Sequence, residues 1–210
     1  MFLLMGAPAG CRQCGDAPPV QRQASGRQGG ASHSSAVERS SGGLRFESER
    51  VELTLSAGRL QVRGVYTFGN PGPRLWRGRI GYPILVGPGQ RPPERVVVDR
   101  GDVLPVRCRT PERCAAVVSL GLPPSGSQTL RLRYEQRLTG RRAAYLVTTA
   151  RRWRRPLRRA DFVIRVPAAW RGVALSYPPD RDTVQGSLRI LRFSRRGFVP
   201  KKELVVTWDE

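Results

Sequence analysis

Hydrophobic and polar residues alternate with a period of two along most of the chain after residue 43. Residues 59–68 show this pattern clearly. Their apolar and polar members fall on opposite sides of an extended strand: Leu60, Val62, Tyr66 and Phe68 against Arg59, Gln61, Arg63 and Thr67. Because successive side chains of a strand point to opposite faces, the pattern predicts a strand with one face in a core and the other in water.

Residues 129–138 alternate in the same way, with Leu130, Leu132, Tyr134 and Leu138 against Thr129, Arg131, Arg133, Glu135 and Arg137. Similar short patterns predict strands at 51–55, 95–99, 115–120, 144–149, 162–166, 188–193 and 204–208. Clusters of Gly and Pro separate them, and no segment has the pattern of a three-turn amphipathic helix. The sequence therefore predicts an all-β fold, a single-domain antiparallel β-sandwich over residues 44–210.

The N-terminal part of the chain has a different composition. Residues 12–43 are rich in Gly, Ser, Gln and Pro and almost free of large apolar side chains. Such a segment cannot bury enough surface to offset the entropy lost on ordering it. We predict that it is a disordered tether.

Residues 1–11 combine a short apolar stretch with small residues and Cys11. They resemble the end of a secretion signal, although a basic segment is missing and the apolar stretch is short. Ala9-Gly10-Cys11 also matches the end of the bacterial lipoprotein cleavage box, but Pro8 departs from that pattern. We expect export, with lipidation of Cys11 as a hypothesis. The alternatives are a start codon assigned too far downstream and an N-terminus without function.

The chain is strongly basic, with 37 Lys plus Arg against 16 Asp plus Glu and a formal net charge of +21. Only Lys201 and Lys202 are lysines, so arginine supplies nearly all of the positive charge. Residues 12–43 hold four arginines and two carboxylates, a net +2, which leaves +19 for residues 44–210. This charge fits an anionic partner. A bias toward arginine in the coding genome would explain most of it equally well.

The four cysteines form two pairs along the chain. Cys108 and Cys114 bracket a turn-like segment between two predicted strands, so we predict a disulfide formed in an oxidising compartment. Cys11 and Cys14 have the spacing of a redox or zinc motif but lie in the tail. A zinc site would need both pairs to converge, and the spacing of the second pair is loose for a metal. We expect no metal site.

The only histidine, His33, lies in the tether, which excludes a His-dependent nucleophilic site in the domain. Carboxylate chemistry stays formally open, but no spacing pairs two of the candidates on a common face: Asp99, Asp102, Glu112, Glu135 and Asp161. Gly87-Pro88-Gly89 precedes further turn residues, unlike a phosphate-binding loop. We therefore expect no enzyme, no catalytic residues and no cofactor.

Residues 151–159 hold a dense cluster, made up of Arg151, Arg152, Trp153, Arg154, Arg155, Arg158 and Arg159. Arginine forks bind phosphate, sulfate or carboxylate, and a tryptophan can stack on a base or a sugar. One hypothesis is therefore an anion-binding site. The alternative, which we favour, is that Trp153 and Leu157 pack into the sandwich while the arginines are solvated. A nucleic-acid module would also interleave more aromatic residues.

Four segments resemble a family of exported, β-rich bacterial proteins that have no established activity. They are residues 43–53 with 63–70, Ile80-Gly81-Tyr82-Pro83, residues 144–150 continuing to Trp153 and Pro156-Leu157, and residues 198–206. Ala150 replaces a glycine of the family pattern, and the region around Cys108 has no counterpart in it. The resemblance covers residues 44–210. It implies an exported β-rich domain in which Trp153 and Pro156 have structural roles.

Together these observations predict a non-enzymatic, exported β-sandwich module that binds or assembles at the bacterial cell envelope. Its location would be periplasmic, cell-surface or secreted, with Cys11 as the candidate membrane anchor. The alternative function is binding of an anionic polymer (nucleic acid, acidic polysaccharide or acidic lipid) through the cluster at 151–159. The sequence identifies no specific partner.

Overall fold

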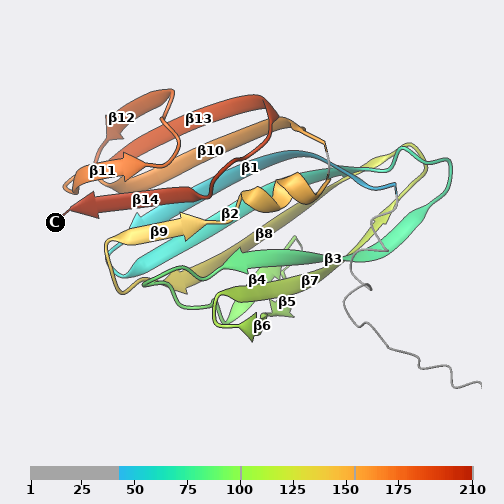
Figure 1. Ribbon diagram of the computed structural model, residues 1–210, viewed down its shortest axis with the longest axis horizontal. Helices are drawn as coiled ribbons and strands as arrows, with labels where there is room; N and C mark the ends of the chain where they lie inside the picture. Colours follow the sequence, from blue (N-terminus) through green and yellow to red (C-terminus); the bar gives the residue numbers. More distant parts are fainter. Residues whose placement is uncertain (1–42, 100, 154, 210) are drawn as a thin grey trace, which may run out of the picture. The chain divides into compact units, whose positions relative to one another are not determined.

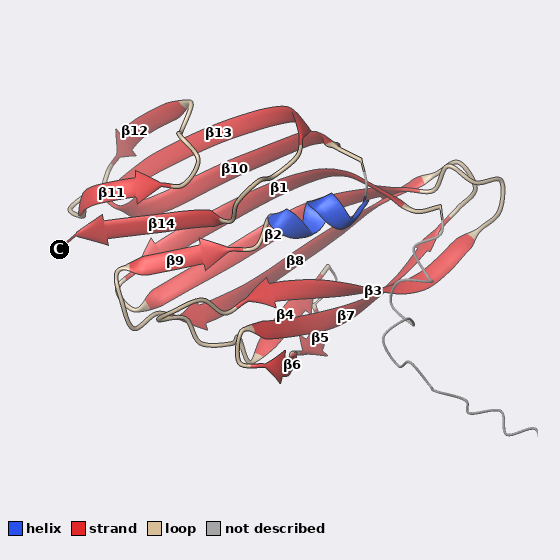
Figure 2. Cartoon of the chain, viewed as in Figure 1, coloured by secondary structure: helices blue, strands red, loops and turns tan. Residues whose placement is uncertain are grey.

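The computed structural model describes residues 43–99, 101–153 and 155–209, which form two layers of β-sheet (Figures 1 and 2). The predicted signal-like segment 1–11, with Cys11, and nearly all of the predicted tether lie outside these residues. Export signal, lipidation and tether therefore stay predictions.

The first layer is an eight-stranded sheet with the order β12-β13-β10-β1-β2-β8-β4-β5. Its strands are β1 (Arg45–Ser56), β2 (Arg59–Gly69), β4 (Arg95–Val98), β5 (Asp102–Pro105), β8 (Ser127–Arg137), β10 (Leu157–Pro167), β12 (Arg181–Gln185) and β13 (Leu188–Phe198). Neighbouring strands are antiparallel except β1 and β10, which pair in parallel. The predicted all-β, largely antiparallel sandwich is confirmed.

The second layer consists of two three-stranded sheets that overlie one face of the large sheet (Figure 1). One has the order β11-β14-β9 and the other the order β3-β7-β6. These strands are β3 (Trp76–Leu85), β6 (Arg107–Thr110), β7 (Arg113–Leu122), β9 (Arg142–Tyr145), β11 (Arg171–Leu175) and β14 (Leu204–Asp209). A short 3-10 helix, η2 (Thr148–Trp153), follows β9 and contacts β1.

The core lies between the layers, and the alternation of the strands decides which side chains enter it. In β2 and β8 every apolar residue assigned to the inner side by the sequence pattern is buried, and the arginines assigned to the outer side are exposed. Phe162 of β10 and Phe193 of β13 stack in this core with their ring centroids 4.6 Å apart. The prediction of sidedness for these two segments is confirmed.

Several elements differ from the sequence prediction: strands β3, β5, β6, β11 and β12 were not predicted, and one predicted strand is shorter than expected. The strand expected at 144–149 ends at Tyr145, and the chain continues into η2. The Glu203 carboxylate stabilises this turn, because it accepts hydrogen bonds from the backbone N–H of Val147 (2.8 Å) and from the backbone N–H and hydroxyl of Thr148. Strand β3 was missed because glycine and proline interrupt its sequence. A Cβ atom at Gly78 would lie 2.7 Å from the Trp76 ring, so a larger residue there would displace that ring.

Buried glutamines connect the two small sheets where no backbone pairing joins them. The Gln90 side chain donates to the Ala144 carbonyl (3.1 Å) and accepts from the Ala144 N–H (2.8 Å), so it pairs with β9 as a peptide group would. Gln136 of β8 donates to the Leu85 carbonyl (3.0 Å) at the end of β3, and its Oε1 accepts a hydrogen bond from the Gln90 side chain (3.3 Å), which completes the connection. These amides satisfy backbone groups that would otherwise be buried without partners.

Candidate anion-binding surface

The strand register brings arginines together on the outer face of the eight-stranded sheet, the face turned away from the core. Four pairs of arginines are direct partners on adjacent strands: Arg59 and Arg137, Arg63 and Arg133, Arg181 and Arg192, and Arg159 and Arg196. Opposed residues of antiparallel strands have Cα atoms only about 4.5–5.5 Å apart. The charges therefore lie side by side.

We define the arginine face as the outward positions of the six strands from β12 to β8, counting β1 from Ser48 onward, beyond its bulge. Among the described residues it carries eleven arginines: Arg50, Arg59, Arg63, Arg131, Arg133, Arg137, Arg159, Arg165, Arg181, Arg192 and Arg196. It carries three carboxylates: Glu52, Glu135 and Asp161. Eleven minus three gives a formal charge of +8 on one side of one sheet.

Four of the eleven arginines use these three carboxylates. Glu52 lies between Arg50 (3.6 Å) and Arg165 (2.9 Å). The other two ion pairs are Arg59 with Glu135 (3.3 Å) and Arg159 with Asp161 (2.7 Å). The remaining seven have no ion pair within the described part of the chain: Arg63, Arg131, Arg133, Arg137, Arg181, Arg192 and Arg196.

Unpaired arginines in direct opposition cost stability. Like charges on directly opposed strand residues repel by about as much as favourable cross-strand pairs attract, roughly 0.2–1 kcal/mol. Arg63 and Arg133 are such a pair at the centre of the sheet, and both side chains are exposed. A bound anion would remove this repulsion, because two guanidinium groups at this spacing can hold one phosphate, sulfate or carboxylate between them.

The predicted cluster at 151–159 is divided by the fold. Trp153 is half-buried at the end of η2, and its ring centroid lies 5.9 Å from that of Phe46 and 5.6 Å from that of Phe68. Leu157 is fully buried, whereas Arg151, Arg155 and Arg158 are exposed.

Of this cluster, Arg159 lies on the arginine face, whereas Arg151 belongs to η2 in the second layer. Arg154 and the side chain of Arg152 are outside the described part of the chain. Anion binding by the cluster as a unit stays a prediction.

The predicted disulfide between Cys108 and Cys114 is present. The two residues are cross-strand partners in the β6–β7 hairpin, with their Cα atoms 3.9 Å apart. Cys114 is buried and Cys108 is exposed. A disulfide at this position fits a protein that folds in an oxidising compartment.

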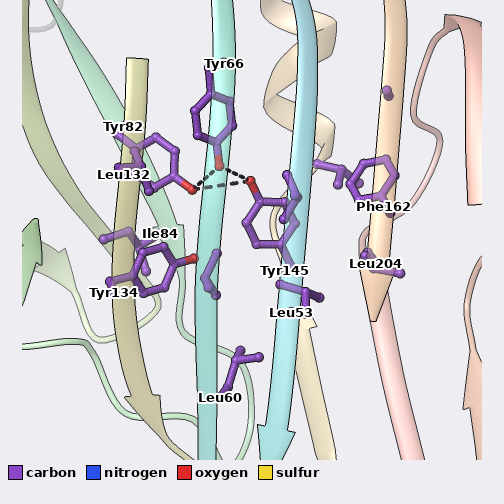
Figure 3. Close-up of a cluster of buried hydrophobic side chains, with 14 of the residues drawn as sticks. Leu53, Leu60, Tyr66, Tyr82, Ile84, Leu132, Tyr134, Tyr145, Phe162 and Leu204 are labelled. Carbon is purple, nitrogen blue, oxygen red and sulfur yellow. Dashed lines mark hydrogen bonds between the residues drawn. The ribbon is translucent and has the colours of Figure 1, made fainter. Parts of the chain in front are cut away.

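The interior contains a second polar cluster, formed by tyrosines that join the two layers (Figure 3). The hydroxyl of Tyr66 on β2 hydrogen-bonds to those of Tyr82 on β3 (2.8 Å) and Tyr145 on β9 (2.7 Å). The latter two are 3.3 Å apart, so the three hydroxyls close a ring. Burial raises the pKa values of all three tyrosines. The hydroxyls satisfy one another and therefore hold the layers together.

Glu49 lies beside this ring, on β1 opposite Tyr66. It is 5% exposed, and its Oε1 atom has no hydrogen-bond partner among the described residues. Burial raises its pKa from 4.5 to about 8. Sequence reasoning missed this group, although its position among the inward residues of β1 was a usable signal.

The carboxylates considered from the sequence do not converge. Glu135 and Asp161 pair with arginines on the outer face, and the Asp99 carboxylate accepts the backbone N–H of Arg131 (2.9 Å). Within residues 43–99, 101–153 and 155–209, no three metal-binding side chains come together in a candidate site. In the same part of the chain, no helix has the length and apolar character needed to cross a membrane.

The fold has counterparts among solved structures. A candidate nutrient-binding protein from Legionella pneumophila aligns with a TM-score of 0.55 and 11% identity, over 79% of this chain and 67% of that chain. An M1 zinc metallopeptidase from Deinococcus radiodurans, in a mutant form bound to a Tyr-Ser-Ala substrate, aligns with a TM-score of 0.45 and 22% identity. That alignment covers 79% of this chain and 42% of the peptidase, so the chain spans about two fifths of that protein.

A candidate protease from Parabacteroides distasonis aligns with a TM-score of 0.46 and 11% identity, over 80% of this chain and 40% of that chain. At these identities the likeness concerns the β-rich fold alone. No family model and no curated protein matches the sequence. Membership in the exported family that the sequence resembles therefore stays a prediction.

Proposed function

We propose that this protein is a non-enzymatic, exported binding module that engages anionic partners at the cell envelope through its arginine face. The observation that carries the proposal is the register, which places four pairs of arginines in direct opposition on one outward surface. A bias toward arginine in the genome would scatter these residues over all solvent-exposed positions. It would not by itself favour like-charge pairs, which destabilise a sheet.

The disulfide in the β6–β7 hairpin supports the exported location, because thiols are kept reduced in the cytosol. A binding function is favoured over catalysis because the carboxylates of Glu135, Asp161 and Asp99 form ion pairs or backbone hydrogen bonds on the surface. The hydroxyls of the buried tyrosines hydrogen-bond to one another. Of the residues 151–159 that the sequence suggested as an anion-binding site, the proposal includes Arg159, which lies on the arginine face.

The proposal is tested by the salt-dependent affinity of the full-length, oxidised protein for heparin, used as a general polyanion. The variant R63Q/R133Q removes two positive charges from the β2–β8 end of the arginine face. We expect it to bind about tenfold more weakly, with the slope of log K against log salt smaller by about two.

The matched control is R77Q/R79Q, which removes two exposed arginines from β3 in the second layer. We expect the control to bind nearly as the wild type does. If both variants lose affinity equally, binding follows net charge alone, and the arginine face is not a site.

A further inference from the structure

The arginine face contains one row of residues that crosses the strands at right angles. The register aligns Arg181, Arg192, Val163, Glu52, Arg63 and Arg133 from β12 to β8. Four of these six residues are arginines that have no ion pair among the described residues. With strands about 4.8 Å apart, the five steps of the row span about 24 Å.

The single carboxylate of the row does not interrupt its positive charge. Glu52 is held by Arg50 on one side and by Arg165 on the other, and both arginines belong to the adjacent rows. The local sum of these three groups is +1. An anionic chain lying along the row would therefore meet positive potential over its whole length.

The twist of the sheet limits the shape of the partner. Adjacent strands rotate by about 20–25°, so the five steps from β12 to β8 turn the row through about 100–125°. A planar membrane or a rigid duplex touches such a surface over only part of the row. A flexible chain can follow the twist and contact arginines at both ends.

The side chains around the row limit the chemistry of the partner. The aromatic residues of the six strands take part in the core, and the outward positions between the arginines are small, aliphatic or polar. Single-stranded nucleic acids bind proteins largely by stacking on aromatic side chains, and protein partners anchor through apolar and aromatic groups. The row has no aromatic residue and its one apolar residue, Val163, is buried, so its partner is recognised by charge.

We infer that the row Arg181–Arg192–Arg63–Arg133 is the binding track for a linear acidic polysaccharide that lies across the strands. This inference rests on the proposed function, because it assigns a partner to the same face. Carboxylate or sulfate groups carried along a flexible chain match guanidinium forks that are spaced along the row. A sugar polymer outside the cytoplasm also agrees with the disulfide.

The test measures the affinity of the full-length, oxidised protein for polyuronate and heparin oligosaccharides of increasing length. We expect affinity to rise until the oligosaccharide spans about 24 Å and then to level off. Because the two ends of the track act together, R181Q/R192Q and R63Q/R133Q should each weaken binding of the longest oligosaccharide about tenfold. R181Q/R192Q should change the affinity for the shortest oligosaccharides less than twofold, since these can bind at the other end.

A control on the same face separates a track from diffuse attraction. R59Q/R137Q removes two opposed arginines that lie about 14 Å along the strands from Arg63 and Arg133. We expect a loss of less than threefold in this variant. If R59Q/R137Q loses as much affinity as R63Q/R133Q does, the row is not a binding track.

Three further probes test the class of partner: anionic phospholipid vesicles, duplex DNA and poly-glutamate, each at matched charge concentration and salt. If the protein binds any of these probes more tightly than the oligosaccharides, and R63Q/R133Q still weakens that binding, the assignment of a polysaccharide partner is wrong but the arginine face remains the binding surface. If R63Q/R133Q affects none of the probes, the proposed function fails as well.

Discussion

Glu49 provides the sharpest test of the interior, because a single proton decides whether this carboxyl is compatible with the core. Its side chain is 5% exposed and its Oε1 has no partner among the described residues. Burial raises its pKa from 4.5 to about 8 in the folded protein. In the unfolded chain the group ionises near its ordinary value.

The sign of the effect follows from proton binding. Between pH 4.5 and about 8 the folded protein keeps the proton of Glu49 and the unfolded chain has released it. The free energy of unfolding therefore falls as the pH rises through this window, and it is flat above it. A shift from 4.5 to about 8 corresponds to a loss of about 5 kcal/mol, taking about 1.4 kcal/mol for each pH unit.

Glu49→Gln keeps the shape of the neutral acid and removes its ability to ionise. We expect the variant to have nearly wild-type stability at pH 4.5 and to be more stable by about 3–5 kcal/mol at pH 9. The tyrosines beside Glu49 do not obscure the effect, because burial raises their pKa values above 10. Urea unfolding followed by tryptophan fluorescence at several pH values measures the difference.

Glu135→Gln is the matched control, since this carboxylate is exposed and pairs with Arg59 on the surface. We expect it to change stability by less than about 1 kcal/mol at every pH. The reasoning about Glu49 is refuted if the stability difference between Glu49→Gln and the wild type is the same at pH 4.5 and pH 9. In that case the carboxyl is hydrated or paired in solution.

Three other substitutions have defined outcomes. A Cβ atom at Gly64 would lie 2.0 Å from the Tyr66 hydroxyl, so Gly64→Ala should displace that ring and lower stability by about 2–4 kcal/mol in urea unfolding. Arg133→Glu places opposite charges where Arg63 and Arg133 now repel, and the partner of residue 133 on its other side is the uncharged Val97, so the change should stabilise the protein by roughly 0.5 kcal/mol at low salt, a gain that 1 M salt removes. Trp153→Ala should lower the free energy of unfolding by about 2 kcal/mol, because the ring packs on two phenylalanines. The affinity of the folded protein for heparin should stay unchanged. A loss of affinity without a loss of stability would show that Trp153 contacts the ligand.

The alternation of residues was sufficient to predict the strands at the centre of the sandwich. In β2 and β8 each side chain lies on the side that its position in the sequence assigns to it, since the period of a strand is two. The Cys108–Cys114 disulfide was also predictable, because a short turn between two strands brings its ends together. Strand β3 was not predicted, since Gly78, Gly81 and Pro83 interrupt its alternation of apolar and polar residues.

The candidate site depended on the tertiary structure. Alternation assigned Arg63 and Arg133 to outward faces, but it did not show that these faces belong to adjacent strands in register. That pairing joins segments about seventy residues apart. The sequence also contained no sign that β1 and β10 pair in parallel, a contact that places Arg165 beside Glu52. For the strands that alternation predicted, the sequence alone determined which side meets water, because that follows from local geometry. Only the fold decided which strands are neighbours, and therefore whether a high net charge is dispersed or gathered into one surface.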